Sequence, residues 1–214
     1  MTAVSHPPDD LLMAYGAGSL DELTAVLVAT HLSLCPHCCA EVALVEAMGG
    51  ALLEDLAPAE MADNALAAIL KRLDEPAPRR VPVAPARSDR LPGPLSDYLP
   101  GGLQALAWKR LGRGIEQVVL LRRDAAKLRL LRIGAGVAVP AHGHRGTELT
   151  LVLRGGFTDL GRHYGPGDVA GADVATVHSP AADDGEACLC LAVTDAPLRL
   201  TGMLGRLINP FLDL

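Results

Sequence analysis

Residues 136–155 read GVAVPAHGHRGTELTLVLRG, and this stretch decides how the second half of the chain folds. Three side chains that can bind a metal, His142, His144 and Glu148, occur within seven residues. In an extended segment residues i and i+2 share a face, so the two histidines can reach one ion together. A strand that begins at Glu148 is predicted by alternating leucines, Leu149, Leu151 and Leu153. The pattern therefore predicts a metal site where a loop enters a strand.

The spacing of this stretch resembles the first motif of the cupin superfamily, G-x5-H-x-H-x3-E-x6-G, at every fixed position. The second and looser cupin motif is similar to Gly165-Pro166-Gly167-Asp168 followed by His178. The resemblance implies that His178 completes a site of three histidines and one carboxylate inside a small β-barrel. Such a ligand set suits zinc or another divalent transition metal.

Beyond residue 100, short apolar runs alternate with glycine-containing turns, as expected for an all-β sandwich or barrel. Strands are predicted over residues 108–111, 117–121, 127–133, 148–153, 175–178 and 187–193. Cys188 and Cys190 lie on one face of the last strand. We interpret them first as core thiols and second as a redox pair. On a straight strand such positions lie about 7 Å apart, beyond disulfide geometry.

The length of 214 residues allows one large or two small domains, and half of the residues are apolar. Aromatic residues make up only 3%, which argues against a platform that stacks nucleic-acid bases. The net charge of −6 is uneven. Residues 1–75 contain twelve Asp and Glu against only Lys71 and Arg72, so this segment carries −10 and the remainder +4. An acidic first third repels DNA and fits a basic protein partner.

The N-terminal residues lack a basic segment followed by an apolar core, so no signal peptide is expected. The longest uncharged stretch, residues 23–40, is marginal in length for a membrane span. Five cysteines are an odd number, which favours metal ligation or free thiols over a disulfide framework. We therefore expect a cytoplasmic protein with no membrane segment.

The first third of the chain predicts a small bundle of helices over residues 9–15, 20–34, 36–48 and 61–73. Ser19-Leu20-Asp21-Glu22 fits a capping box at the start of the second helix. Pro36 suits the first turn of the third helix, and Gly49-Gly50 predict its end. The fourth helix is predicted from the spacing of its apolar residues.

The sequence HLSLCPHC at residues 31–38 predicts a second metal site. His31 and Cys35 are four residues apart and share one helix face, and Cys38 can swing back past the helix break. These three residues suit a tetrahedral zinc site, which would supply folding energy that a short bundle lacks. His6, just before the first helix, is the best candidate for the fourth ligand. Spacing leaves two neighbours as alternative ligands, Cys39 and His37.

This H-x3-C-x2-C pattern with an upstream histidine is similar to the zinc-binding anti-sigma domain of bacterial regulators. Those regulators inhibit extracytoplasmic-function sigma factors. Such a domain followed by a cupin resembles the ChrR-type anti-sigma factors over nearly all of the chain. The resemblance implies that the first domain holds zinc and binds a sigma factor in a 1:1 complex, without contacting DNA. It also implies that the cupin senses oxidative stress, such as singlet oxygen, and triggers release, and that the chain is not an enzyme.

The rival hypothesis is a metal-dependent cupin enzyme of the dioxygenase or isomerase type. Such an enzyme needs an open coordination position and a positioned acid or base. No convincing base is evident in the sequence beyond the four cupin ligands. The attached inhibitory domain favours sensing over catalysis.

The predicted fold class is a multidomain α plus β chain. A small zinc-binding helical bundle spans residues 1–75, and an all-β cupin barrel of the jelly-roll type spans residues 96–200. Residues 76–95 are a semi-extended linker rich in Pro, Ala and Arg, and residues 201–214 are a C-terminal extension. The linker arginines are interpreted as solvated rather than as a nucleic-acid tail, because no aromatic residues are interleaved with them. The predicted metal ligands are His6, His31, Cys35 and Cys38 in the first domain and His142, His144, Glu148 and His178 in the second.

Overall fold

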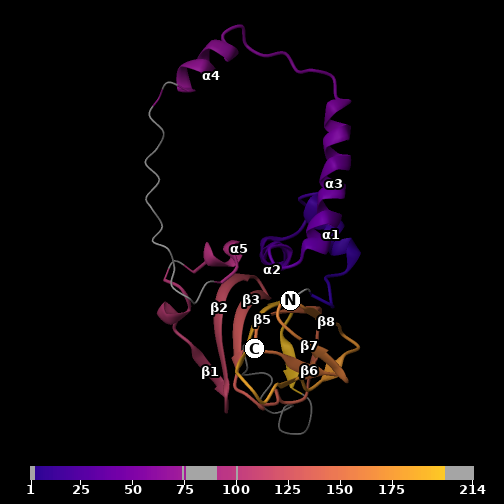
Figure 1. The fold of residues 1–214 in the computed structure, drawn as a ribbon, viewed down its shortest axis with the longest axis vertical. Helices are drawn as coiled ribbons and strands as arrows, with labels where there is room; N and C mark the ends of the chain where they lie inside the picture. The colour runs from indigo at the N-terminus through magenta and orange to yellow at the C-terminus, as the bar shows by residue number, and fades with distance from the viewer. Residues whose placement is uncertain (1–2, 74, 76–90, 100, 201–214) are drawn as a thin grey trace.

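A computed structural model of the chain describes residues 3–73, 75, 91–99 and 101–200. Most of the predicted linker and the whole predicted C-terminal extension lie outside these residues. Helices stand at one end of a β-barrel, and the third helix runs away from it (Figure 1). The helices are α1 (Asp9–Gly16), α2 (Glu22–Leu32), α3 (Pro36–Glu54) and α4 (Ala65–Leu73), with the short α5 (Gly93–Ser96) and η1 (Leu103–Ala105) before the barrel. The predicted class, a helical region followed by a β cupin domain, is confirmed.

Two predictions about helix ends were wrong. The cap of α2 is Asp21, whose carboxylate accepts the N–H groups of Leu23 and Thr24 at 2.9 and 3.2 Å. The Ser19 hydroxyl instead donates to the carbonyl of Ala14. Helix α3 continues through its two glycines to Glu54, where its end had been predicted near Met48. Each glycine costs about 1 kcal/mol, and the Ala, Leu and Glu residues that follow favour helix and offset this cost.

The barrel is built from one six-stranded sheet and two three-stranded sheets, all paired antiparallel. The large sheet has the order β1 (Lys109–Gly112), β2 (Ile115–Arg123), β3 (Ala126–Ile133), β11 (Cys188–Thr194), β5 (Glu148–Arg154) and β8 (Val169–Ala172). The small sheets have the orders β10 (Ala181–Ala182), β6 (Phe157–Asp159), β7 (Arg162–Tyr164) and β12 (Leu198–Leu200), β4 (His142–His144), β9 (Val177–His178). All six predicted strands are present. Six strands were missed, because runs of two to four residues are too short to show a period.

Strand β11 lies at the centre of the large sheet, and all seven of its residues are buried. On its outer face Leu189, Leu191 and Val193 share a core with Leu23, Val26 and Leu27 of α2. On its inner face Cys188 and Cys190 join the apolar interior of the barrel. A strand covered on both faces is apolar throughout. The helical region and the barrel therefore share one hydrophobic core across α2.

The expected distance between Cys188 and Cys190 was wrong. Their sulfur atoms lie 3.4 Å apart, and both thiols are buried and free. The pairing of β11 with β5 shifts register between Leu189 and Cys190, so this strand is not straight. Burial and the hydrogen bond with Cys188 raise the pKa of Cys190 well above its ordinary value. Cys190 is therefore present as a protonated thiol.

Candidate metal centres

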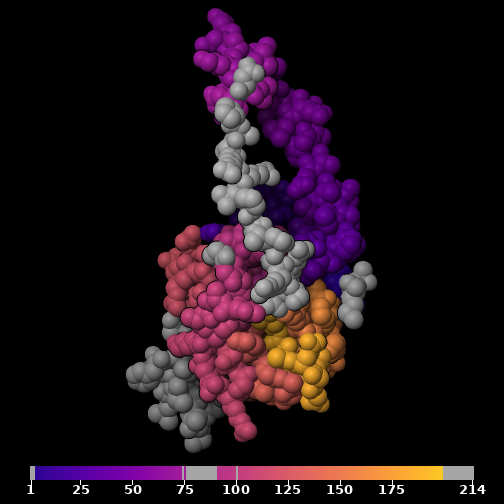
Figure 2. Space-filling model, turned by 60° about the vertical axis from the view of Figure 1, so that its left-hand side comes forward, coloured from indigo at the N-terminus to yellow at the C-terminus, as the bar shows by residue number. Residues whose placement is uncertain are grey.

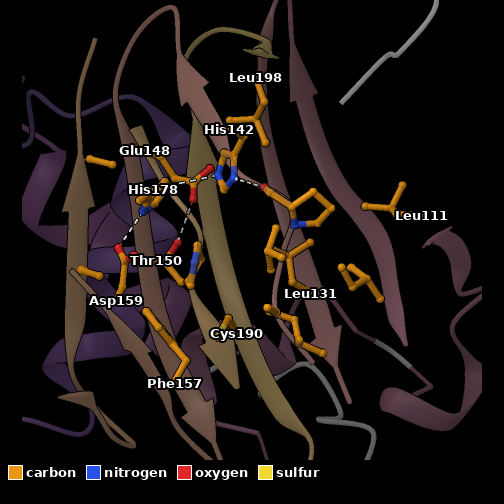
Figure 3. A pocket seen from close by; sticks show the side chains of 18 of the residues that line it. Leu111, Leu131, His142, Glu148, Thr150, Phe157, Asp159, His178, Cys190 and Leu198 are labelled. Carbon is orange, nitrogen blue, oxygen red and sulfur yellow. Dashed lines mark hydrogen bonds and ion pairs between the residues drawn. The ribbon is translucent and has the colours of Figure 1, made fainter. Parts of the chain in front are cut away.

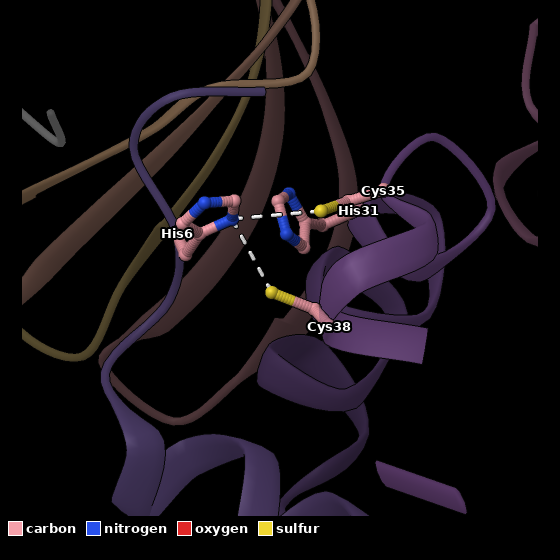
Figure 4. A group of neighbouring side chains, drawn as sticks. All are labelled: His6, His31, Cys35 and Cys38. Carbon is pink, nitrogen blue, oxygen red and sulfur yellow. Dashed lines mark hydrogen bonds between the residues drawn. The ribbon is translucent and has the colours of Figure 1, made fainter. Parts of the chain in front are cut away.

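The N-terminal cluster, defined as His6, His31, Cys35 and Cys38, is assembled from three segments of the chain (Figure 4). His6 precedes α1, His31 lies in the last turn of α2, and the cysteines flank the start of α3. The potential ligand atoms of all four residues lie within 4.8 Å of one another. The structure thus brings together the four residues that spacing selected.

The geometry of the N-terminal cluster fits a tetrahedral metal ion. The Nδ1 atom of His6 lies 3.5 Å from the Cys35 sulfur and 3.3 Å from the Cys38 sulfur. Bonds of about 2.0 to 2.3 Å to zinc would separate tetrahedral ligand atoms by roughly 3.3 to 3.8 Å. The buried Nε2 of His31 has no hydrogen-bond partner among the described residues, and its Nδ1 lies 2.8 Å from the Gly167 carbonyl oxygen. The His31 ring thus presents a free lone pair to the cluster.

Electrostatics also favours a cation at the N-terminal cluster. In the metal-free chain, burial and the neighbouring Cys35 raise the pKa of Cys38 to about 12. A cation must be present for both thiols to lose their protons at neutral pH, since two buried thiolates would repel each other. The alternative ligands His37 and Cys39 are exposed, although the His37 ring stacks edge-on against His6. The structure leaves both outside the group of converging ligand atoms.

The cupin cluster is defined as His142, His144 and His178. Figure 3 shows His142 and His178 beside Glu148 inside the barrel. Strand β4 carries the first two, and β9 pairs with β4 so that His178 lies opposite His142. The Nε2 of His178 lies 3.0 Å from the Nε2 of His142 and 2.9 Å from that of His144. All three rings are buried and aim the same nitrogen at one point.

Hydrogen bonds from the far side of two rings decide which nitrogen is protonated. The Nδ1–H of His142 donates to the Pro140 carbonyl at 3.0 Å, and the Nδ1–H of His178 donates to the Asp159 carboxylate at 2.6 Å. In neutral rings both Nε2 atoms are then acceptors, and they face each other without a proton between them. Burial lowers the pKa of both His142 and His144, which favours the neutral rings. Such facing lone pairs fit a cation.

Glu148 does not belong to the converging group, although the first motif predicts it as a ligand. It enters the same cavity from β5, opposite the histidine strands. The Thr150 hydroxyl donates to one carboxylate oxygen at 3.3 Å, and the other lies 3.9 Å from Nη2 of Arg129. That second oxygen is buried without a hydrogen-bond partner in the described chain. Glu148 therefore keeps a free acceptor oxygen beside the cupin cluster.

The cavity around the cupin cluster has a volume of about 520 Å³ and mostly apolar walls. Its walls include Leu131, Ile133 and Phe157, and Cys190 reaches it from β11. Asp159, which holds His178, is the site residue that the sequence did not reveal. It lies 19 residues before its partner and belongs to no motif, so only the pairing of strands places it there.

Residues 102–197 match the family model of the ChrR cupin-like domain. Anti-sigma-E factor ChrR of Cereibacter sphaeroides is 45% identical over 211 residues, covering 99% of each chain. The chain belongs to the ChrR family of anti-sigma factors. The ChrR family resemblance of both domains is thus confirmed, and the chain is a regulatory protein rather than an enzyme.

A solved ChrR structure agrees with the fold. The crystal structure of Rhodobacter sphaeroides SigE in complex with the anti-sigma ChrR contains a chain that is 44% identical. The match covers 91% of this chain and 100% of that chain, with a TM-score of 0.76. Among the helices that the structure describes, none has the length and apolar character needed to cross a membrane.

Replacing Asp159 by asparagine is expected to weaken metal binding at the cupin cluster by about 10- to 100-fold. An outer carboxylate fixes the tautomer of a ligating histidine and raises its basicity, and the amide loses the charge. Competition with a chelator would measure the affinity. The control is Asp183→Asn, since Asp183 contacts the exposed His163 instead. Equal affinities in the two variants would show that Asp159 does not tune the site.

The lowered pKa values of His142 and His144 make the stability of the metal-free chain depend on pH. Below 6.5, their ordinary value, the folded rings stay neutral while the unfolded chain takes up protons. Because the unfolded state then binds more protons, stability is expected to fall from about pH 7 to pH 5. Urea unfolding of chelator-treated protein at several pH values would measure this slope. The slope should be shallower in His144→Gln, and an unchanged slope would contradict the assignment.

Proposed function

We propose that this chain is an anti-sigma factor that binds one extracytoplasmic-function sigma factor in the cytoplasm. The inhibitory unit is residues 1–75, stabilised by zinc at the N-terminal cluster, and the cupin unit is residues 96–200. Family membership supports the proposal, because a ChrR relative was crystallised in complex with the sigma factor SigE. The observation in this chain that carries it is an apolar surface on α3 and α4.

This apolar surface lies on helices that project from the barrel (Figures 1 and 2). On α4 the large apolar residues are spaced i, i+3, i+4 and i+7, which places them on one face. Each is more than half exposed: Leu66, Ile69, Leu70 and Leu73. On α3, Leu44, Met48 and Leu52 are spaced four residues apart, and their side chains are 62 to 71% exposed. Exposed apolar rows on two helices are typical of a protein interaction site.

The charge of the helical region supports a basic partner. Residues 1–75 carry a net charge of −10, while the chain as a whole carries −6. Opposite charge on the partner would speed association and set its orientation, and the apolar residues would supply most of the affinity. A sigma factor that presents basic and apolar surface fits both features. Bound there, the inhibitory unit would cover sigma surfaces that RNA polymerase needs.

The two metal sites have different chemistry, which supports different roles. The N-terminal cluster offers two nitrogens and two sulfurs, a closed set that suits structural zinc. The cupin cluster offers three nitrogens beside a free carboxylate oxygen and a cavity, which suits zinc or another divalent transition metal. A metal ion there would supply a site at which an oxidant can react with the ligands. Oxidants such as singlet oxygen would then shift an equilibrium between the sigma-bound and released forms.

Substituting the α4 surface tests the binding role. The double variant Leu66→Glu, Ile69→Glu is expected to lose sigma affinity by about 30-fold or more, because apolar anchors buried in an interface each contribute roughly 1 kcal/mol or more. Zinc content should stay unchanged. The control Leu160→Glu, Val174→Glu places the same two charges at exposed residues of the barrel. Titration with the cognate sigma factor gives the affinities, and wild-type affinity in the double variant would remove α4 from the interface.

Substituting the cupin ligands tests whether inhibition belongs to the helical unit and sensing to the cupin unit. With His142, His144 and Glu148 replaced by alanine, inhibition should persist while release under singlet oxygen is lost, because the inhibitory helices are unaltered. Transcription from a sigma-dependent promoter, with and without oxidant, reports both properties. Loss of inhibition in the unstressed state would refute the assignment of sensing to the cupin unit.

A further inference from the structure

The loop between β7 and β8, residues 165–168, reaches out of the barrel and contacts the N-terminal cluster. The Gly167 carbonyl oxygen accepts a hydrogen bond from Nδ1 of His31 at 2.8 Å. The Asp168 carboxylate accepts the backbone N–H of Ser5 at 2.9 Å and that of Val4. In addition, the N–H of Val169 donates to the Ser5 carbonyl at 3.0 Å. The barrel thus forms a direct hydrogen bond with His31 and also binds the backbone of Ser5, the residue that precedes His6.

Burial, hydrogen bonds and backbone conformation hold the contacting groups of this loop in position. Asp168 is 7% exposed, and its second carboxylate oxygen accepts the N–H of Gly165 at 2.9 Å, so both oxygens are occupied. Burial alone would raise the pKa of Asp168, but the hydrogen bonds from Ser5, Gly165 and Val4 lower it. Gly167 has a φ of +94°, which favours glycine, and a Cβ there would lie 3.5 Å from Ala3. The carboxylate and the glycine carbonyl are therefore fixed in place.

These contacts have a direct consequence for metal binding. A histidine ligand whose other nitrogen donates to a carbonyl has a fixed tautomer and a more basic ligating nitrogen. Gly167 does this for His31, whose buried Nε2 has no hydrogen-bond partner among the described residues. Asp168 anchors the backbone at Ser5 and thereby fixes the position from which His6 reaches the two cysteines.

The same loop is also tied to the strand that carries Glu148. Gly167 N–H donates to the Val152 carbonyl at 2.9 Å, and Val152 N–H donates to the Asp168 carbonyl at 3.0 Å. Val152 lies on β5, which begins at Glu148, and β8 pairs along β5 so that Ala172 faces Glu148. Residues 170–172 of β8 line the cavity of the cupin cluster. A short path of backbone hydrogen bonds therefore connects the two metal sites.

We infer that Gly167 and Asp168 are positioning residues for the N-terminal cluster, so that the cupin barrel completes the outer shell of the zinc site. The affinity of the N-terminal cluster for its metal then depends on the state of the barrel. By thermodynamic linkage, occupancy of the cupin cluster and affinity at the N-terminal cluster are coupled. The positioning requires only that the N-terminal cluster binds a metal, whereas its use in releasing a sigma factor rests on the proposed function.

The test compares Asp168→Ala with Asp173→Ala in the full chain. Asp173 also accepts a backbone N–H within the barrel, from Ala175, and its carboxylate accepts the Thr176 hydroxyl of the same turn. Cobalt(II) bound to thiolates has charge-transfer absorption that reports the N-terminal cluster alone, and chelator competition gives its affinity. We expect Asp168→Ala to lose about 10- to 100-fold, as outer-shell substitutions do, and Asp173→Ala to match the wild type. Wild-type affinity in Asp168→Ala overturns the inference.

The effect of the cupin cluster on metal affinity at the N-terminal cluster gives a second test. A purely structural role of Asp168 would leave this effect unchanged. In the wild type, emptying the cupin cluster by His178→Ala is expected to change the affinity of the N-terminal cluster by about 5-fold or more. In the Asp168→Ala background the same substitution should change it less. An equal change in both backgrounds overturns the coupling through this loop.

Hydrogen exchange tests the contact without relying on the folding of any variant. In the wild-type chain the amides of Val4 and Ser5 should be protected, because both donate to Asp168. Exchange at the rate of an unstructured segment would overturn the inference. None of these measurements contains a sigma factor, so their outcome is independent of whether the proposed function is correct.

Discussion

Both candidate metal centres are defined by buried ring nitrogens whose lone pairs converge on one point with no proton between them. At the cupin cluster, His142 and His178 direct their ring protons outward to Pro140 and Asp159, and their inner nitrogens face each other at 3.0 Å. At the N-terminal cluster the inner nitrogen of His31 meets two cysteines beside His6. Unpaired buried acceptors are costly. A cation would satisfy both groups, so each arrangement of strands and helices is consistent with a site prepared for a metal ion.

Residues that are close in sequence were predictable because local geometry places them. The period of a strand predicts that His142 and His144 share a face, and β4 confirms it. The expectation that His31 and Cys35 share one helix was wrong, because α2 ends at Leu32 and Cys35 precedes α3, although both residues reach the same cluster. The outer shell was not predictable. Asp159 reaches His178, and Gly167 reaches His31 across 136 residues, through strand pairing and domain packing that leave no mark on spacing. Ligands that are neighbours in the sequence are thus predictable from their spacing, whereas the distant ligands His6 and His178 and the groups that orient the rings are placed by the fold.

The same difference between local geometry and long-range packing explains the errors in the predicted fold. A strand of seven buried residues such as β11 shows clearly in the sequence, and its alternation correctly predicted that its cysteines share a face. The register shift that brings their sulfurs to 3.4 Å depends on how β11 meets β5. At α2, Ser19 and Asp21 both fit a capping pattern. Asp21 caps the helix, and the Ser19 hydroxyl donates to the Ala14 carbonyl of α1, a contact that depends on how α1 ends.

The size of the coupling limits how release can work. An outer-shell change of 10- to 100-fold in metal affinity corresponds to about 1.4 to 2.7 kcal/mol. Converting a complex from 99% bound to 99% released requires about 5.5 kcal/mol. The loop at Gly167 and Asp168 therefore supplies at most half of the change. The remainder must come from a larger contact that differs between the two states. The core that α2 shares with the barrel through Leu23, Val26 and Leu27 has the necessary size, since each buried leucine is worth about 1.5 to 3 kcal/mol. On the proposed function, full release would require the helical region to move on the barrel, and the loop would bias that movement.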